Sequence, residues 1–81
     1  MSLGERLESL KKRRRSVRPQ EMDSLLIDAG FQRRYGKGDH WVYSHPELPY
    51  PLTIDPRNPL LPAYVSKAIR AMEEVLNDED D

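Results

Sequence analysis

Two helix-like segments, each with a single apolar stripe, enclose three short strand-like segments, and this order restricts the fold more than any other feature of the chain. The first stripe begins after Pro19 and comprises Met22, Leu25, Leu26 and Ala29, with Gly30 as the expected C-terminal cap. The second begins after Pro62 and comprises Val65, Ala68, Ile69, Met72 and Val75 or Leu76. We therefore predict helices at residues 19–29 and 62–76, each of which must bury one face.

The segments between the predicted helices combine β-forming residues with turn signals. Residues 31–35 and 40–45 flank the turn sequence GKGD, and residues 52–55 lie between two proline-rich connections. Since 81 residues support one domain with a small core, we expect an α+β fold of order α-β-β-β-α. Both helices should cover one face of a three-stranded antiparallel sheet, as in double-stranded-RNA-binding domains, and leave the other face to solvent or a ligand.

The two ends of the chain differ in charge. Residues 1–18 form a basic N-terminal extension: a short stripe of Leu3, Leu7 and Leu10 precedes five successive cations, Lys11 to Arg15, for which we expect a frayed helix or mobile arm. The stripe is either a cap over the core or a contact for a partner or a second copy in a homodimer. Residues 19–76 form the predicted domain, and residues 77–81 an acidic tail.

The charge balance along the chain suggests where a polyanion would bind. Lys and Arg outnumber Asp and Glu by 10 to 6 in residues 1–40, whereas they are outnumbered by 8 to 3 in residues 41–81. Because cations neutralise phosphates and release counterions, we expect any nucleic acid on the N-terminal side of the molecule.

Composition argues against several classes of protein. The chain has no cysteine, which excludes disulfides and thiolate metal sites and is compatible with a reducing compartment. No apolar run approaches the roughly 18 residues of a membrane span, and the start lacks the apolar core of a secretory signal. The sequence GKG is too short for a nucleotide-binding phosphate loop. We expect a cytoplasmic protein without metal, cofactor or membrane contact.

The two histidines fall on opposite faces of the strand predicted at residues 40–45. Alternation places His40 with Val42 and Ser44, and His45 with Trp41 and Tyr43, so at most one histidine is catalytic. His40 is the better candidate because it follows a glycine-containing turn, where a ligand can approach the backbone closely. Its imidazole could take the proton of an RNA 2′-hydroxyl. The alternative is a polar turn residue bonded to the backbone.

Basic and aromatic residues close to His40 in the sequence are candidates for RNA contact. The planar guanidinium of arginine can donate two hydrogen bonds to one phosphate, and lysine contributes a positive charge, so Arg33, Arg34 and Lys37 are candidate phosphate contacts. Gly38 would allow the backbone to approach the RNA closely. Trp41 could stack on a base, although an aromatic residue in a middle strand more often belongs to the core. Three cations of the N-terminal segment are further RNA candidates or simply solvated: Arg13, Arg14 and Arg15.

The motifs between residues 19 and 72 resemble the HicA (YcfA-like) mRNA interferase toxins. The resemblance rests on the helix before AGF, a short basic strand, Gly38 and His40, and an aromatic-rich strand that ends in His45 and Pro46. It implies a toxin of a bacterial toxin–antitoxin system: a metal-independent endoribonuclease that acts on mRNA through His40. It also implies a HicB-type antitoxin protein as partner, covering the active face.

Two positions differ from the family pattern and keep a second hypothesis open. Asp39 stands where the family usually has serine, and its charge favours a protonated His40 while repelling phosphate. After Asp55 the chain has PRNPLLP where the family usually has a basic segment with another histidine. These differences favour a catalytically silent RNA-binding or protein-interaction module on the same fold.

Overall fold

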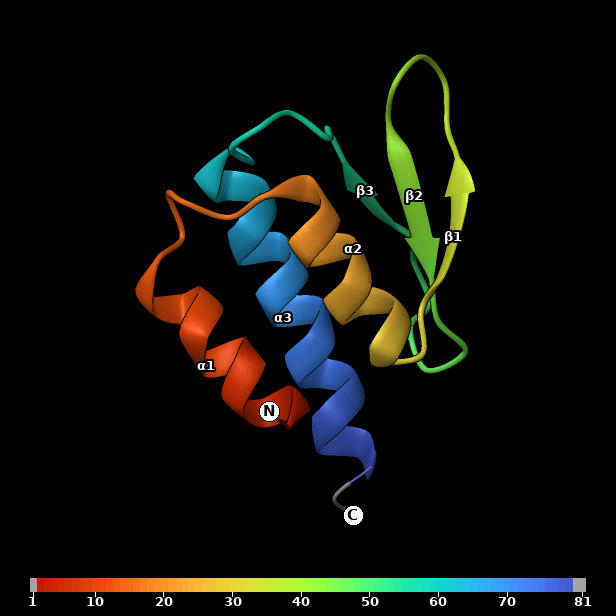
Figure 1. The fold of residues 1–81 in the computed structure, drawn as a ribbon. Coiled ribbons are helices and arrows are strands. Elements are labelled where there is room, and N and C mark those ends of the chain that lie inside the picture. The colour runs from red at the N-terminus through yellow and green to blue at the C-terminus, as the bar shows by residue number, and fades with distance from the viewer. Residues whose placement is uncertain (1, 80–81) are drawn as a thin grey trace.

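A computed structural model of the chain describes residues 2–79, with side chains described up to residue 76, and has three helices on one side of a three-stranded sheet (Figure 1). The elements in chain order are α1 (Leu3–Lys12), α2 (Pro19–Asp28), β1 (Gln32–Tyr35), β2 (Trp41–Ser44), β3 (Leu52–Ile54) and α3 (Pro62–Glu79). The predicted α+β order of helix, three strands and helix is confirmed from α2 to α3, and α1 precedes it as an additional helix.

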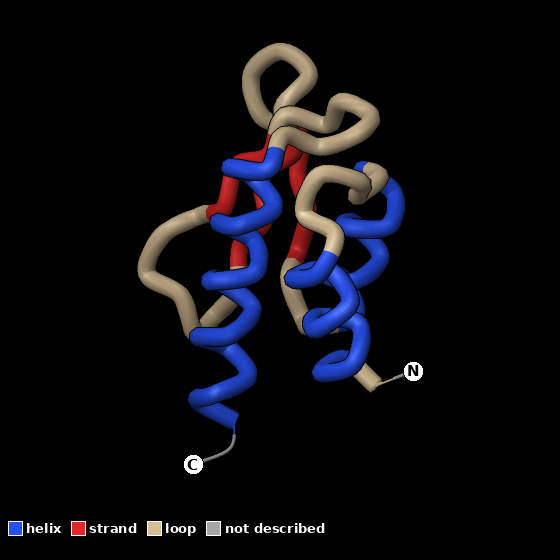
Figure 2. Tube along the Cα trace, turned by 90° about the vertical axis from the view of Figure 1, so that its left-hand side faces the viewer, coloured by secondary structure: helices blue, strands red, loops and turns tan. Residues whose placement is uncertain are grey.

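The sheet is antiparallel with the strand order β1-β2-β3, and its register fixes which residues share a face. On the inner face, Tyr43 lies opposite Leu52, and both side chains are buried. On the outer face, Arg34 lies opposite Val42, which lies opposite Thr53. Figure 2 shows the helices on one side of the strands. The outer face of the sheet is therefore left uncovered by helices.

Local signals set both ends of α2. Pro19 occupies the first turn, where its missing N–H is no loss. At the other end Gly30 has a φ of 98°, a left-handed conformation that glycine adopts without strain. The Phe31 N–H donates to the Leu26 carbonyl at 3.0 Å, and the Gly30 N–H donates to the Ile27 carbonyl at 3.0 Å. This Schellman cap ends the helix at the predicted glycine and leads the chain directly into β1.

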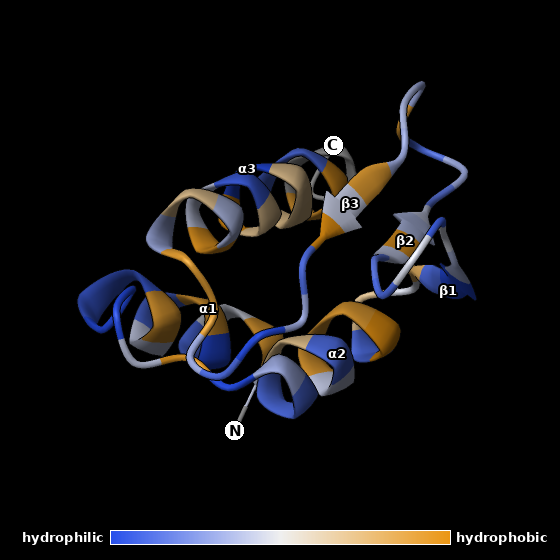
Figure 3. Cartoon of the chain, turned by 90° about the horizontal axis from the view of Figure 1, so that it is seen from above, coloured by the Kyte–Doolittle hydropathy of each residue, from blue (hydrophilic) through white to orange (hydrophobic). Residues whose placement is uncertain are grey.

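The apolar stripes of the helices and the inner face of the sheet share one core. The residues expected to be buried together are all buried: Met22, Leu25, Leu26, Ile69 and Met72. Tyr43 of the middle strand is also fully buried, and its hydroxyl donates to Asp23 of α2 at 2.7 Å. Figure 3 shows α2 and α3 between the sheet and α1. The core thus extends through two helix layers.

The C-terminal helix is longer than the apolar stripe predicts. It was expected to end near Leu76, and α3 continues to Glu79. Residues 80–81 of the predicted acidic tail lie outside the described residues. Across the described part of the chain, no helix combines the length and the apolar character needed to cross a membrane.

The segment predicted as a basic extension contributes a helix and three buried residues to the domain. α1 packs on α2 and α3, with Leu7, Leu10 and Val17 buried in the common core. Ser2 caps the helix, because its Oγ accepts from the Glu5 N–H at 3.2 Å and donates to the Glu5 carboxylate at 3.1 Å. Of the two hypotheses for the leucine stripe, a cap over the core and a contact for a partner, the structure shows the cap over the core.

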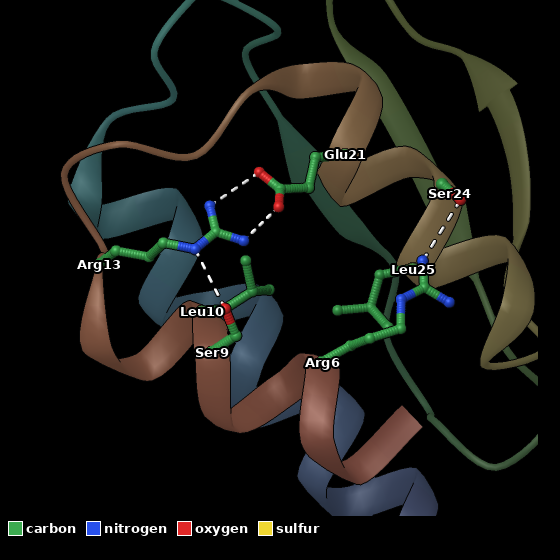
Figure 4. A pocket seen from close by; sticks show the side chains of 7 residues that line it. All are labelled: Arg6, Ser9, Leu10, Arg13, Glu21, Ser24 and Leu25. Atoms are coloured by element: carbon green, nitrogen blue, oxygen red, sulfur yellow. Dashed lines mark hydrogen bonds and ion pairs between the residues drawn. The ribbon is translucent and has the colours of Figure 1, made fainter. Parts of the chain in front are cut away.

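Acids and hydroxyls of the other helices hold four cations of this segment: Arg6, Lys11, Arg13 and Arg14. Arg6 pairs with Asp28 at 2.6 Å, Lys11 pairs with Glu73 at 2.8 Å, and Arg14 donates to the Ser66 hydroxyl at 2.8 Å. In Figure 4, Arg13 reaches from the end of α1 to both carboxylate oxygens of Glu21, and its Nε donates to Ser9. Ion pairs and hydrogen bonds therefore hold α1 against α2 and α3 along its length.

The pair between Arg13 and Glu21 makes stability sensitive to acid. Hydrogen bonds from Arg13 hold the pKa of the Glu21 carboxyl below its ordinary value. A folded-state pKa below the unfolded one contributes stability that is complete above the unfolded pKa of about 4.3 and is lost as the pH falls through the folded value.

We expect Glu21→Gln to lower the free energy of unfolding at pH 7 by about 1 kcal/mol or less. The effect is small because the two side chains are 36% and 38% exposed. Urea unfolding at pH 7 and pH 3 measures it, and the difference between wild type and variant should shrink at pH 3. An equal difference at both pH values would show that the carboxylate charge is not the source of the stabilisation.

Candidate functional site

His40 lies at the end of the β1–β2 turn, immediately before β2. The turn is closed by the Gly36 N–H, which donates to the His40 carbonyl at 2.9 Å. A side chain at Gly36 would meet Val42 at 2.8 Å, and Gly38 has a φ of 64°. Both glycines are therefore needed for the close approach of the two strands and for the reversal of the chain.

The backbone of this turn also fixes one nitrogen of the imidazole. His40 Nδ1 lies 3.2 Å from the Lys37 carbonyl oxygen. A carbonyl only accepts hydrogen bonds, so Nδ1 carries the proton in this contact. In the neutral ring Nε2 is then unprotonated, and the side chain is exposed to solvent. The arrangement presents Nε2 as a base.

His45 has a different environment and a structural role. Its Nδ1 accepts from the Glu47 N–H at 3.0 Å, and its ring lies 5.0 Å from the Phe31 ring. A side chain at Gly30 would meet His45 Nε2 at 3.0 Å, so the ring packs directly over the end of α2. The two histidines therefore have different surroundings, and both lie just outside β2, one before its first residue and one after its last.

His40 lines a cleft of about 440 Å³ between β3 and α3, which we call the β3–α3 cleft. Besides Pro51 and Leu52 of the strand region, its lining residues are His40, Tyr50, Thr53, Tyr64, Lys67 and Arg70. Of the residues described along this cleft, His40 alone carries an imidazole. The cleft therefore combines one base, two cations and two aromatic rings.

The cations of the β3–α3 cleft are free for an external anion. Within the described residues neither Lys67 nor Arg70 forms an ion pair, and Lys67 Nζ lies 5.8 Å from the centre of the Tyr64 ring. Tyr50 donates to Glu74 at 3.2 Å; partial burial and this bond raise the pKa of the Tyr50 phenol, while the nearby Arg70 charge opposes the rise. Positive charge thus gathers on the α3 side of the cleft.

The neighbouring candidates Arg33 and Arg34 lie on opposite faces of the sheet. Arg33 pairs with Asp23 at 3.1 Å, and its guanidinium lies 5.1 Å from the centre of the Trp41 ring. Burial and the bond to Asp23 also raise the pKa of the Tyr43 phenol far above its ordinary value. Arg34 is exposed on the outer face, in register with Val42. Only Arg34 of the two remains free to contact a phosphate.

The remaining sequence candidates are divided between two distant regions. Lys37 and Gly38 are exposed in the turn that carries His40. The three cations Arg13, Arg14 and Arg15 lie in the connection from α1 to α2, on the far side of the helices from that turn (Figure 1). Trp41 is half-buried on the inner face under Arg33, so its ring is turned toward the core.

A second cavity, of about 500 Å³, lies between α1 and α2 and is drawn in Figure 4. Leu10 and Leu25 contribute its apolar surface. Its charged residues already bond to one another or to neighbours: Arg13 to Glu21, and Arg6 to Asp28 and to the Ser24 hydroxyl. This groove therefore offers a ligand little free charge, in contrast to the β3–α3 cleft.

Two cleft residues on α3, Lys67 and Arg70, were not candidates at the level of sequence. They belong to the half of the chain with an excess of acid, and nothing local marks them as neighbours of His40. Comparisons with protein-family models, with curated proteins and with solved structures find no match to this chain, so the candidate site rests on the geometry of its own residues.

Proposed function

We propose that this protein is a metal-independent endoribonuclease that cuts RNA in the β3–α3 cleft with His40 as general base. The observation that carries the proposal is that His40, with Nε2 unprotonated in the neutral ring, shares one cleft with Lys67 and Arg70, which form no ion pair among the described residues. A base beside two phosphate-binding cations suits attack of a 2′-hydroxyl on the adjacent phosphate.

The proposed reaction requires one proton acceptor and stabilisation of negative charge. His40 Nε2 takes the proton of the 2′-hydroxyl as that oxygen forms a bond to phosphorus. The bond from phosphorus to the 5′-oxygen breaks, and the leaving oxygen takes a proton from water. Lys67 and Arg70 stabilise the charge that grows on the phosphoryl oxygens, because a cation placed next to a developing negative charge lowers its energy.

The resemblance to HicA toxins gives this activity a biological setting. The motif residues Gly38, His40, His45 and Pro46 fall at the start and end of β2, and the order from α2 to α3 suits a double-stranded-RNA-binding-domain-like fold. We therefore extend the proposal to an mRNA-cleaving toxin of a toxin–antitoxin pair. Its HicB-type antitoxin would cover the β3–α3 cleft.

A second candidate function is RNA binding without cleavage on the same fold. Two observations favour it: Asp39 adjoins His40 with an exposed carboxylate that repels phosphate, and the Tyr50 hydroxyl already donates to Glu74. The cleft would then hold RNA through Lys67 and Arg70 without completing the reaction. Binding and cleavage must therefore be measured separately.

RNA affinity should depend on salt through the β3–α3 cleft. For single strands, each neutralised phosphate contributes a slope of about 0.7 to the fall of log affinity with log salt. Replacing Lys67 and Arg70 together by alanine should make the slope about 0.7 smaller if both cations hold one phosphate, and about 1.4 smaller if each holds its own. The matched control replaces the exposed Lys12 and Arg15 by alanine, which removes the same charge from outside the β3–α3 cleft.

Fluorescence titrations of a labelled single-stranded RNA at several salt concentrations measure both slopes. The control should keep the wild-type slope. A slope that changes only in the Lys12 and Arg15 variant would place the RNA on the α1 side, and an unchanged slope in both variants would remove the cleft from RNA binding.

A further inference from the structure

Two aromatic rings reach the β3–α3 cleft from different elements of the chain. Tyr64 belongs to the first turns of α3, and Tyr50 belongs to the connection between β2 and β3. We propose that these rings hold one unpaired base of the RNA, while Lys67 and Arg70 hold the phosphate of the same nucleotide. This inference rests on the proposed function of the cleft and adds a base-binding subsite to it.

On the α3 side of the cleft, one aromatic ring and two cations follow one another along the same helix. Tyr64, Lys67 and Arg70 follow at intervals of three residues, a rise of about 4.5 Å for each step. Lys67 Nζ lies 5.8 Å from the centre of the Tyr64 ring, so charge and ring are adjacent. A nucleotide presents the same pair of features, a phosphate next to an aromatic base, and bases stack on aromatic side chains.

Tyr50 is held in place on the other side of the cleft. Its hydroxyl donates to Glu74 of α3 at 3.2 Å, and 46% of the residue remains exposed. The bond limits the freedom of the ring without covering it. The Glu74 carboxylate also disfavours a phosphate beside this hydroxyl, so the base belongs near Tyr50 and the phosphate near Lys67.

The size of the cleft and the accessibility of its rings favour a single-stranded ligand. At about 440 Å³ the cleft falls in the lower part of the range of small-molecule sites, which suits one nucleotide. A base inside a duplex is stacked and paired, and its insertion here would require its removal from the helix. Unpaired RNA avoids this cost, so we expect single strands to bind better than duplexes.

Other aromatic residues do not offer the same environment. Tyr43 is buried, and Trp41 is half-buried beneath the Arg33 guanidinium. Tyr35 is the most exposed aromatic residue among those described as exposed, at 76%, but it does not line the β3–α3 cleft. Tyr35 is therefore a suitable control for aromatic binding that is not specific to the cleft.

The test compares two small probes on the His40→Ala variant, so that cleavage plays no part. Adenosine 5′-monophosphate and ribose 5-phosphate share the sugar phosphate and differ by the base. If the base stacks on the tyrosine rings, adenosine 5′-monophosphate should bind about 5- to 150-fold more tightly than ribose 5-phosphate. Titrations followed by amide chemical shifts give both dissociation constants and report whether residues 50–53 and 64–70 respond.

Added to the same His40→Ala background, Tyr64→Leu keeps apolar bulk but removes the ring, and Tyr50→Leu does the same on the opposite side. Each should weaken nucleotide binding and leave ribose 5-phosphate unchanged, whereas Tyr35→Leu should alter neither. Equal affinity of the two probes for the His40→Ala protein, or a loss in Tyr35→Leu alone, would overturn the base subsite.

The result separates this inference from the proposed enzymatic activity. If the His40→Ala protein prefers the nucleotide but the wild-type protein cuts no RNA, the result would support the subsite and contradict the endoribonuclease. RNA cleavage by a protein with equal affinity for both probes would support the endoribonuclease and overturn the subsite.

Discussion

Replacing His40 by alanine is expected to lower the rate of RNA cleavage by about 10² to 10⁴-fold, the usual contribution of a general acid–base group. The side chain is exposed, and the contact that it makes with the rest of the chain is a polar one at the Lys37 carbonyl. The fold should therefore survive the change. The assay follows cleavage of a single-stranded RNA in the presence of a chelator, with circular dichroism as a check of folding.

The control variant for this experiment is His45→Ala. Because His45 packs on Phe31 and accepts from the Glu47 backbone, its loss should reduce stability but not the rate for each folded molecule. DNA of the same sequence should remain intact, since it lacks the attacking 2′-hydroxyl. Equal losses in both variants would remove the special role of His40, and inhibition by the chelator would contradict the metal-independent mechanism.

Shortening Leu10 to alanine should destabilise the protein by about 2 to 5 kcal/mol, although it lies in a segment that reads as a charged extension. The residue is only 1% exposed and belongs to the common core. A loss of this size is a large fraction of the roughly 5 to 15 kcal/mol that stabilise a typical domain. Urea unfolding, followed by circular dichroism, measures the change in the free energy of unfolding.

Leu61 provides the matched control, because it is 41% exposed. Leu61→Ala should change the free energy of unfolding by about 0.5 kcal/mol or less. A similarly small change for Leu10→Ala would show that α1 is not part of the cooperative unit.

The elements from α2 to α3 could be predicted because their signals are local. The apolar stripe that begins at Met22, Gly30 at the helix end and the glycines of the β1–β2 turn each act on residues a few positions away. The place of α1 could not be predicted in the same way. Its cations find partners such as Glu21 and Glu73 only after the helices pack.

The candidate site could be predicted in part for the same reason. Strand alternation predicts opposite faces for His40 and His45, which lie just outside β2, and it places Arg33 and Arg34 on opposite faces of the sheet. Sequence cannot reveal that Asp23 pairs with Arg33, or that Lys67 and Arg70 line the same cleft as His40, because these contacts depend on how α2 and α3 pack against the sheet. The excess of basic residues near the N-terminus predicts RNA on the α1 side, whereas the proposed site is the β3–α3 cleft.

The most direct test of the account is to map bound RNA on the protein by amide chemical shifts. A 2′-O-methylated single-stranded RNA is suitable, since it keeps its phosphates and bases but lacks the attacking hydroxyl. Binding in the β3–α3 cleft predicts the largest shifts at residues 37–40, 50–54 and 64–70. Shifts centred on residues 11–18 instead, or none in the cleft, would contradict the assignment of the β3–α3 cleft as the site of RNA binding.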